Sequence, residues 1–365
     1  MKKKIELLIQ FLFDFTDKLF FKKEFIVFSA RSANAYADNS KILFEALLKK
    51  NTGKIFYYTK NRKVLECIPQ NGVYAYSFKG VYVLLKSRIL VFTHGSSDFY
   101  PYFPDVHPKR IFINLFHAIA IKKTGLKSSL TAANEIKKWN YFIVSSDFEK
   151  GFIKKQYGFN DNQILICGQP RNDIIIKNNL KPSSHEKKLI LYAPTFREQS
   201  LTKLFPFKDV NLEALDRFLG ENSIEIMIRL HINEEKKYKN NYIFQQLKHI
   251  YFLGSNKIPS INDYLHNVDM IVSDYSSITL DYLLLNRPIC YLPYDYDQYN
   301  TNRGFSFDYF KYLAGPIIKN QNDFQSFLLT KEDDYIEKRI ELKNLFHKYQ
   351  DGKSTKRLIK FIEKI

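Results

Sequence analysis

The sequence predicts an α/β protein made of two domains, each built on a parallel sheet covered by helices. Three observations support this: a length of 365 residues, an alternation of short β-branched or aromatic runs with helical patterns, and a restart of that alternation after a polar linker. Domains usually hold about 100–200 residues, so two are expected. Strands that alternate with helices typically form parallel sheets, because each crossover places a helix on a sheet face.

The first half of the chain predicts a domain over residues 23–180. Helical patterns cover 40–50 and 147–157. The polar stretch KNNLKPSSHEKK (177–188) has no periodicity and contains a proline, which is typical of a linker. Runs rich in Val, Ile, Phe and Tyr predict strands at 25–29, 54–58, 88–92, 111–115, 141–146 and 164–167.

The second half predicts a domain over residues 187–365. The pattern restarts there as a further set of βα units, and the tail from Lys331 onward has helical periodicity. The segments of this second set are 188–194, 211–220, 224–230, 242–250, 269–273, 277–285 and 288–292.

Residues 1–22 predict an amphipathic helix rather than a signal peptide or a membrane-spanning segment. No run approaches the roughly 20 apolar residues that span a bilayer, and no small-residue cleavage site follows. Lysines flank both ends, which favours a helix lying in an anionic membrane surface. A helix packed on the protein's own core is the alternative. The predicted apolar face consists of Ile5, Leu8, Leu12, Phe15 and Leu19.

Composition and missing motifs exclude several classes of protein. The formal net charge of +18 predicts affinity for polyanions such as anionic lipid or phosphorylated substrates. Nucleic acid is not a predicted partner, because no RNP-like, zinc-finger or recognition-helix signature accompanies the charge. Three widely spaced cysteines predict neither a zinc site nor a disulfide framework, and fit a reducing cytoplasm. The sequence has no Walker A, GxGxxG, HExxH or GxSxG motif. These absences argue against a P-loop nucleotide hydrolase, a common Rossmann dehydrogenase, a zincin and an α/β-hydrolase.

Polar residues recur directly after predicted strands, where α/β sheets bind ligands. His117 follows IFINL, and local pattern alone favours a core histidine there. His94, after RILVF, is interpreted as structural. The segment SDYSSITLDYLL predicts a loop entering a helix, whose first N–H groups and the hydroxyls of Ser276 and Ser277 would bind a phosphate. Simple helix capping is the alternative. Asp281 would hold a sugar hydroxyl or only favour the helix N-terminus.

Two other strand ends offer cationic side chains. In APTFRE, Thr195 supplies a hydroxyl and Arg197 is a candidate for bidentate phosphate contact. A surface ion pair between Arg197 and Glu198 is the commoner arrangement. Arg229 and His231 lie two apart on a predicted strand, hence on one face, where a cationic pair would neutralise a leaving phosphate. A hydrogen-bonded histidine at a strand end is the alternative.

The motifs, in order over residues 24–360, resemble those of the CDP-glycerol glycerophosphotransferase family of teichoic-acid and capsule synthesis. IVFSARSANAYADNSKILFEAL, with Asp38 and Asn39, is similar to the family's opening strand–loop–helix, and INLFHAIAIKKTG resembles its WHGTPLKKLG segment. GQPRND, YAPTFRE, RLH and SDYSSITLDYLLLNRPICYLPYDYDQYNTNRGFSFDY follow in family order. The family's His-Gly-Thr is His117-Ala118-Ile119 here, which keeps the histidine and alters the residues expected to shape the acceptor side.

The resemblance implies a GT-B architecture, with two Rossmann-like domains and an active site in the interdomain cleft. It implies a CDP-activated polyol phosphate as donor, most simply glycerol phosphate, with CMP as the leaving product. The acceptor would be a hydroxyl of a lipid-linked glycan or polyol phosphate. The protein would then be peripheral, at the cytoplasmic face of the bacterial cell membrane. Neither a cofactor nor a tightly bound metal is expected.

The resemblance also implies residue roles. His117, by its motif position, is the expected general base, because a neutral imidazole suits transfer of the acceptor's hydroxyl proton. Arg229 and His231 are expected to stabilise charge on the pyrophosphate. Lys122 and Lys123 are interpreted as solvated lysines that at most steer anionic substrate. The residues expected to contact phosphate, cytidine or polyol are Thr195, Arg197, Ser276, Ser277, Asp281 and Arg303.

Two rival classes stay open at this point. A GT-B glycosyltransferase that uses a nucleotide sugar would share the fold and differ in its donor. A non-enzymatic basic protein that binds membrane or nucleic acid would release no nucleotide with any acceptor. The sequence leaves open glycerol or ribitol, single transfer or polymerisation, the acceptor's identity and the oligomeric state.

Overall fold

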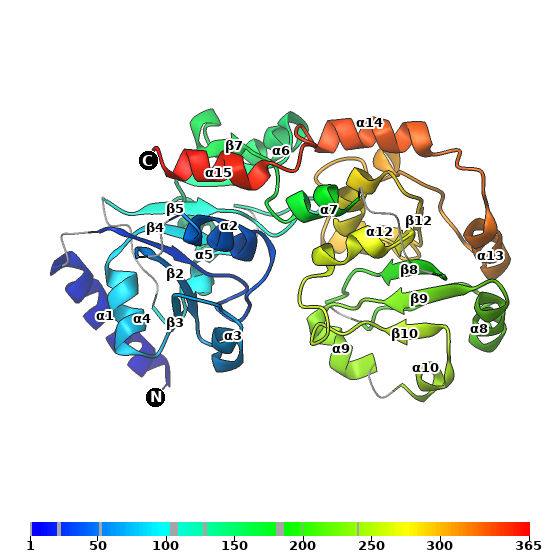
Figure 1. Ribbon diagram of the computed structural model, residues 1–365, viewed down its shortest axis with the longest axis horizontal. Coiled ribbons are helices and arrows are strands. Elements are labelled where there is room, and N and C mark those ends of the chain that lie inside the picture. The colour runs from blue at the N-terminus through cyan, green and yellow to red at the C-terminus, as the bar shows by residue number, and fades with distance from the viewer. Residues whose placement is uncertain are drawn as a thin grey trace. The chain divides into compact units, whose positions relative to one another are not determined.

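The computed structural model describes residues 2–19, 23–50, 53–102, 109–126, 130–179, 186–198, 200–238 and 241–365. The chain divides into two compact units, which are described separately below (Figure 1). Unit 1 comprises residues 1–118, 124–173 and 351–365, and unit 2 comprises residues 119–123 and 174–350.

Unit 1 is built on a parallel seven-stranded sheet with the order β3-β2-β1-β4-β5-β6-β7. Its strands are apolar on both faces, as expected where helices cover a parallel sheet on both sides. The strands are β1 (Phe25–Phe28), β2 (Ile55–Thr59), β3 (Gly72–Tyr74), β4 (Ser87–Phe92), β5 (Ile111–Asn114), β6 (Tyr141–Val144) and β7 (Ile164–Ile166).

Helices α2 and α15 pack together against one face of this sheet, and their apolar residues form one core cluster with its central strands. Helix α6 shows why these segments start and stop where they do. The Ser146 hydroxyl accepts from the Glu149 N–H at its start, and Gly158 takes a left-handed conformation at its end. The helices of unit 1 are α1 (Lys2–Leu19), α2 (Asp38–Leu48), α3 (Arg62–Glu66), α4 (Phe78–Leu85), α5 (Leu130–Ile136), α6 (Asp147–Tyr157) and α15 (Ser354–Ile362).

Unit 2 is built on a parallel five-stranded sheet with the order β10-β9-β8-β11-β12. Helices α8 and α13 contribute to its main core cluster through Leu215, Leu219, Phe324 and Leu328. The strands are β8 (Lys188–Ala193), β9 (Ile224–Ile228), β10 (Ile250–Phe252), β11 (Met270–Ser273) and β12 (Ile289–Tyr291). The helices are α8 (Leu212–Glu221), α9 (Ile232–Tyr238), α10 (Tyr242–Gln246), α11 (Ile278–Tyr282), α12 (Tyr296–Asn302), α13 (Gln321–Leu329) and α14 (Ile336–Phe346).

The α/β class with two parallel sheets is confirmed, but the chain is divided differently from the predicted boundaries. Residues 351–365 belong to unit 1, where the Phe361 ring lies 4.7 Å from that of Tyr141, because α15 completes the core over α2. Helix α7 (Asn172–Asn178) contains the change from unit 1 to unit 2. Within the predicted linker, residues 180–185 lie outside the described residues. The interdomain cleft of a GT-B protein stays a prediction.

Helix α1 packs on the rest of unit 1 through Asp17 and through Phe13, whose buried ring stacks on Tyr102 at 5.3 Å, rather than through the predicted apolar face. The Asp17 carboxylate is buried, and it accepts 2.8 Å hydrogen bonds from two guanidinium nitrogens of Arg110 and a 2.7 Å bond from Lys23 Nζ. The side chains of Ile5 and Leu8 lie outside those described. No helix in the described part of the chain is both long and apolar enough to cross a membrane. Four large apolar side chains of α1 are each more than half exposed: Phe11, Leu12, Phe15 and Leu19.

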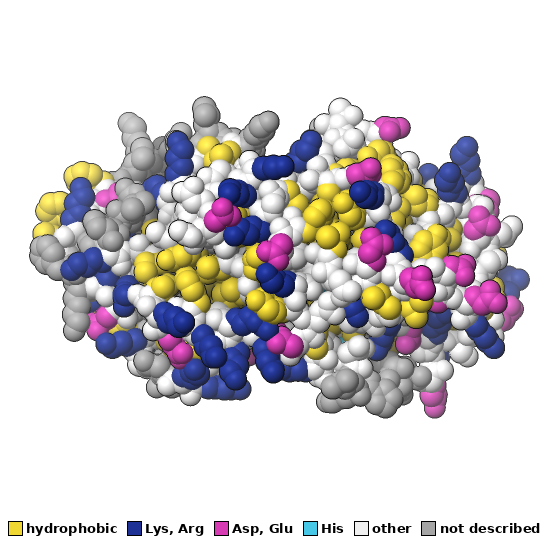
Figure 2. All heavy atoms as spheres, turned by 90° about the horizontal axis from the view of Figure 1, so that it is seen from above, with side chains coloured by type: hydrophobic (Ala, Val, Ile, Leu, Met, Phe, Trp, Pro, Cys, Tyr) yellow, Lys and Arg dark blue, Asp and Glu magenta, His cyan; other side chains and the backbone are white. Residues whose placement is uncertain are grey.

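Basic side chains are spread widely over the surface. Figure 2 shows Lys and Arg side chains scattered over the face in view, between apolar patches and fewer acidic groups. This distribution agrees with the net charge of +18 and predicts attraction of anionic partners over a broad area.

Candidate active site

His117 lies three residues beyond the end of β5, with its imidazole at the surface of unit 1. Its Nδ1 lies 3.3 Å from the carbonyl oxygen of Thr93, which follows the neighbouring strand β4. A carbonyl can only accept, so this contact requires the proton on Nδ1 and leaves the Nε2 lone pair open. The ring is therefore not that of a core histidine, because it is exposed and its Nε2 has no partner among the described residues.

The ring of His94 stacks on that of His117, with centroids 4.1 Å apart and planes 8° from parallel. Both rings follow neighbouring strands, β4 and β5, so adjacent strand ends bring them together. Interpreting His94 from the sequence as merely structural missed this contact. Burial and then the proximity of His94 lower the pKa of His117. Since the ring keeps exposed surface, solvent moderates that shift, and the imidazole is neutral at pH 7.

The backbone before His117 is held in an unusual conformation. Phe116 has φ 50°, a left-handed value that is costly for a bulky side chain. The buried amide of Asn39 stabilises it by donating to the carbonyl oxygens of Leu115 and Phe116 at 3.2 and 3.1 Å. The Arg171 guanidinium donates to the carbonyl of His117 itself. Counting the Thr93 carbonyl, three groups from other parts of the chain thus make four hydrogen bonds to the segment that carries the imidazole.

A second strained turn lies beside this segment in the loop after β1. Arg31, Ser32 and Ala33 have consecutive φ values of 50°, 55° and 61°, and Asp38 has 56°. Arg31 pairs with the buried Asp38 carboxylate at 2.5 Å. The Arg31 and Arg171 charges hold the pKa of Asp38 below its ordinary value against the opposing effect of burial. An anionic Asp38 near His117 would stabilise the imidazolium that forms after proton uptake.

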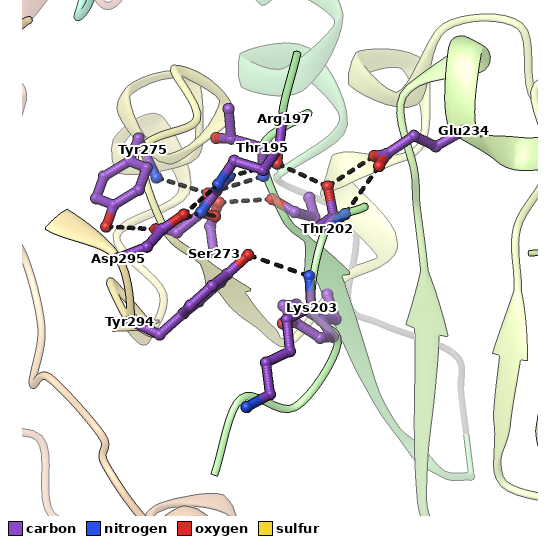
Figure 3. Close-up of polar contacts among 12 residues, drawn as sticks. Thr195, Arg197, Thr202, Lys203, Glu234, Ser273, Tyr275, Tyr294 and Asp295 are labelled. Atoms are coloured by element: carbon purple, nitrogen blue, oxygen red, sulfur yellow. Dashed lines mark hydrogen bonds and ion pairs between the residues drawn. The ribbon is translucent and has the colours of Figure 1, made fainter. Parts of the chain in front are cut away.

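In unit 2, Arg197 is the centre of a buried ion-pair network (Figure 3). Its guanidinium donates to Asp295 at 2.7 and 2.8 Å and to Asp274 at 2.9 Å. Two tyrosine rings, Tyr275 and Tyr299, lie 5.0 Å from its central carbon. The sequence alternatives were a phosphate contact or a surface pair with Glu198. Neither matches this arrangement, because two carboxylates already use most of the guanidinium.

Thr195 lies next to this network, with its backbone N–H donating to Asp274 at 2.8 Å. The Thr195 hydroxyl is buried and has no hydrogen-bond partner among the described residues. By contrast, the buried Thr202 hydroxyl bonds both Glu234 at 2.7 Å and the Thr195 carbonyl at 3.1 Å (Figure 3). An unpaired buried hydroxyl costs roughly 1–3 kcal/mol, so a ligand atom is a natural partner for Thr195.

Ser276 and Ser277 precede α11 as predicted, and neither hydroxyl caps the helix. Ser277 is the N-cap residue, yet its side chain makes no capping hydrogen bond. Both side chains are half-buried, which leaves their hydroxyls available for a ligand. Asp281 differs, because its carboxylate is buried and accepts from the Asn262 amide at 3.0 Å. That placement favours a structural role for Asp281.

Arg229 and His231, the predicted cationic pair, contact different segments of unit 2. β9 ends at Ile228, so Arg229 and His231 follow the strand instead of sharing one of its faces, and that prediction is wrong. Arg229 donates to the Leu253 carbonyl at 3.0 Å, beyond β10, whereas the His231 ring stacks on Phe196, beyond β8.

Arg303 and the two lysines complete the set of sequence candidates. Arg303 is the residue that pairs with Glu198, at 3.2 Å, with both side chains exposed. Lys122 is half-buried rather than solvated, and Lys123 is exposed as predicted. Ile119, at the family's threonine position, is fully buried, and its influence on the acceptor side stays a prediction.

Residues 11–364 match the family described as CDP-Glycerol:Poly(glycerophosphate) glycerophosphotransferase. The chain is 26% identical to the teichoic acid ribitol-phosphate polymerase TarK of Staphylococcus aureus, over 97% of this chain and 71% of TarK. It is also 26% identical to the teichoic acid glycerol-phosphate transferase of the same species, over 100% and 99% of the two chains. The wall teichoic acid polymerase TagF has a similar fold, with a TM-score of 0.80 at 21% identity over 97% of this chain and 92% of that one.

Proposed function

Because this chain belongs to the CDP-glycerol:poly(glycerophosphate) glycerophosphotransferase family, we propose that it transfers a polyol phosphate from a CDP-activated donor to a hydroxyl acceptor. The acceptor is a lipid-linked glycan or polyol phosphate of a teichoic-acid-type polymer, and CMP is released. The observation that carries this proposal is the open Nε2 of His117, whose Nδ1 is held by the Thr93 carbonyl.

The proposed step is an in-line displacement at phosphorus. The acceptor oxygen forms a bond to the phosphorus that bears the polyol, and the bond from that phosphorus to the bridging oxygen of CMP breaks. The hydroxyl proton moves to Nε2 of His117, and CMP leaves with the bonding electron pair. General-base assistance of this kind contributes about 10²–10⁴ in rate, and the anionic Asp38 stabilises the imidazolium.

On the donor side, Thr195, Ser276 and Ser277 supply hydroxyls to the phosphates or the cytidine. Their hydroxyls are not used by the fold, which supports this assignment. The exposed His231 and Arg303 side chains are the candidates to stabilise charge on the pyrophosphate. Arg197 acts indirectly, by fixing the loops that carry these groups.

A donor panel tests the proposal. The purified protein is incubated with CDP-glycerol, CDP-ribitol and UDP-sugars in the presence of a lipid-linked polyol-phosphate acceptor, and nucleotide release and product mass are measured. The expected result is release of CMP, with the acceptor gaining the mass of one polyol phosphate for each CMP released. UDP release from a nucleotide sugar would instead identify a glycosyltransferase, and no release from any donor would exclude an enzyme of either kind.

We further propose that α1 attaches the protein to an anionic membrane surface. Its outward apolar group (Phe11, Leu12, Phe15, Leu19) would enter the bilayer interface, where each such side chain contributes about 1.5–3 kcal/mol when fully buried. The cationic charge of the chain suits an anionic surface. Anchoring through Asp17 and Arg110 leaves this group free for lipid.

Vesicle sedimentation tests this attachment. The paired substitution Phe11→Ser and Phe15→Ser should abolish binding to vesicles that contain phosphatidylglycerol, while Ile336→Ser, at an exposed apolar position of α14, should not. Added salt should weaken binding by the wild type. Equal binding by both variants would refute the proposal, and a concentration-dependent dimer lost in the Phe11/Phe15 variant would identify a second copy as the occupant.

A further inference from the structure

A short segment immediately after His117 is fastened to unit 2. We call residues 119–123 the strap; they belong to unit 2 although the chain on both sides belongs to unit 1. Lys122 forms an antiparallel bridge with Phe305. Ser306 donates its N–H to the Ile121 carbonyl at 2.7 Å and its hydroxyl to the Lys122 carbonyl at 3.0 Å. These bonds fix the backbone of the strap at Lys122, from which the lysine side chain extends.

The Lys122 ammonium lies over the Tyr299 ring, which is also in contact with Arg197. Its Nζ is 5.8 Å from the centre of the Tyr299 ring, which stacks on Tyr275 at 4.3 Å. The Tyr275 hydroxyl in turn donates to Asp295 at 3.0 Å. Lys122 is half-buried. The same cluster includes Asp274, which bonds the Thr195 N–H and lies two residues before Ser276 in the sequence.

Every other cation of this cluster has its own anionic partners. Arg197 holds Asp274 and Asp295, and Arg303 holds Glu198. Across the described part of the chain, the Lys122 ammonium makes neither a hydrogen bond nor an ion pair, although it carries three donors. A partly desolvated ammonium with unused donors is costly unless an anion completes it.

The carboxylates nearby do not need Lys122 as a partner. Asp274 accepts from the N–H groups of Thr195 and Tyr275 and from Arg197. Asp295 accepts from Arg197 through both oxygens and from the Tyr275 hydroxyl. Lys122 could have a purely internal role, in which its charge balances at longer range the carboxylate charge that Arg197 leaves over. That role would leave the three N–H donors of the Lys122 ammonium without hydrogen bonds.

We propose that Lys122 is a phosphate-binding residue, and that its ligand is the diphosphate of a nucleoside diphosphate donor. The unpaired Thr195 hydroxyl and the free hydroxyls of Ser276 and Ser277 provide neutral donors for the same anion. The inference rests on the proposed function for the identity of the donor, but the anion site itself follows from the local contacts of unit 2.

The charge of Lys122 gives the site a pH dependence. Burial, offset by Asp274 and reinforced by Arg303 and Arg197, lowers the pKa of Lys122 to about 8. Glu198 and the Tyr299 ring are the other groups that face it. A lysine is charged below its pKa, so phosphate binding should be full at pH 7 and weaken as pH rises through 8.

Titration calorimetry of the full chain with CDP and with cytidine tests the assignment. Lys122→Met should weaken CDP binding at pH 7 by about 10- to 100-fold, the range of a hydrogen bond to a charged group. Cytidine binding should not change. Lys123→Met, at the exposed neighbour, is the matched control and should alter CDP affinity by less than about twofold.

Lys122→Arg separates charge from structure. Arginine stays protonated, so this variant should retain CDP affinity at pH 7 and lose the decline that the wild type shows between pH 7 and pH 9.5. If Lys122→Met lowers the melting temperature and leaves CDP affinity intact, Lys122 is structural and the inference is overturned. A wild type that releases no CMP from any donor would end the proposed function, while the CDP titration would still decide the role of Lys122.

Discussion

The two polar clusters of this protein handle their charged groups in opposite ways. In unit 1, the imidazole of His117 is exposed, and strained backbone and hydrogen bonds from Asn39 and Arg171 hold it in place. In unit 2, Arg197 is buried, and internal carboxylates satisfy it. A group left with an open lone pair is suited to chemistry, whereas a group with all its partners in the fold is suited to hold loops.

The same distinction applies to the hydrogen-bond donors of unit 2, some of which are used by the fold and some of which are not. Arg197, a phosphate candidate by sequence, has little of its guanidinium left for a phosphate, because Asp274 and Asp295 use most of its donors. The groups with unused hydrogen-bonding capacity are Thr195, which was a predicted contact residue, and Lys122, which the sequence suggested was a solvated lysine. Availability, rather than residue type, thus distinguishes a binding group from a structural one.

The largest expected effect is on catalysis at His117. His117→Ala should lower kcat for CMP release about 10²–10⁴-fold with the fold intact, because the attacking hydroxyl loses its base. Stopped assays with CDP-glycerol measure the rate, and circular dichroism checks the fold. Full activity in the folded variant would remove His117 from the mechanism. His249→Ala, at a histidine of unit 2 outside the proposed site, is the control and should keep its rate.

The next effect is on stability at Arg197. Arg197→Ala leaves the neighbouring Asp274 and Asp295 carboxylates without their cation, and should lower the free energy of unfolding by about 3–5 kcal/mol. Arg303→Ala breaks an exposed pair and should cost less than about 1 kcal/mol. Urea unfolding measures both. Similar losses of unfolding free energy in the two variants would show that the buried Arg197 ion pairs stabilise the fold no more than the exposed Arg303 pair.

A threonine pair gives a smaller effect and a sharper contrast. Thr202→Val removes a hydroxyl that bonds Glu234, and should lower the free energy of unfolding by about 1–3 kcal/mol. Thr195→Val removes an unpartnered hydroxyl, and should leave stability unchanged or slightly higher while raising the KM for the donor. The same loss of stability in both variants, with KM unaffected at Thr195, would refute the ligand role.

The sequence predicted what depends on local pattern. The central strands of both sheets, helices α2 and α6, and the place of His117 after β5 all follow from apolar runs and their ends. Two three-residue strands were missed, β3 and β10, because a run that short is indistinguishable from a turn or a helix end.

The rest depends on contacts between residues far apart in the chain. Arg197 was expected at the surface beside Glu198, but its partners are Asp274 and Asp295, 77 and 98 residues away. The return of α15 to unit 1 and the stacking of His94 on His117 are likewise set by the order of strands in the sheet. The recurrence of polar residues at strand ends was the signal that pointed to His94, since β4 and β5 are neighbours.

The smallest expected effect concerns that stacked pair and the pH dependence of the base. His117 acts when neutral, so kcat/KM should fall on the acid side as the imidazole is protonated. His94 is one cause of the lowered pKa of His117, after burial. His94→Gln should therefore raise that pKa and move the acid limb to higher pH, toward the ordinary value near 6.5. Because burial persists, the limb should stop short of that value. A pH–rate profile measures the shift, and a limb that stays in place, or moves to lower pH, would show that His94 does not tune the base.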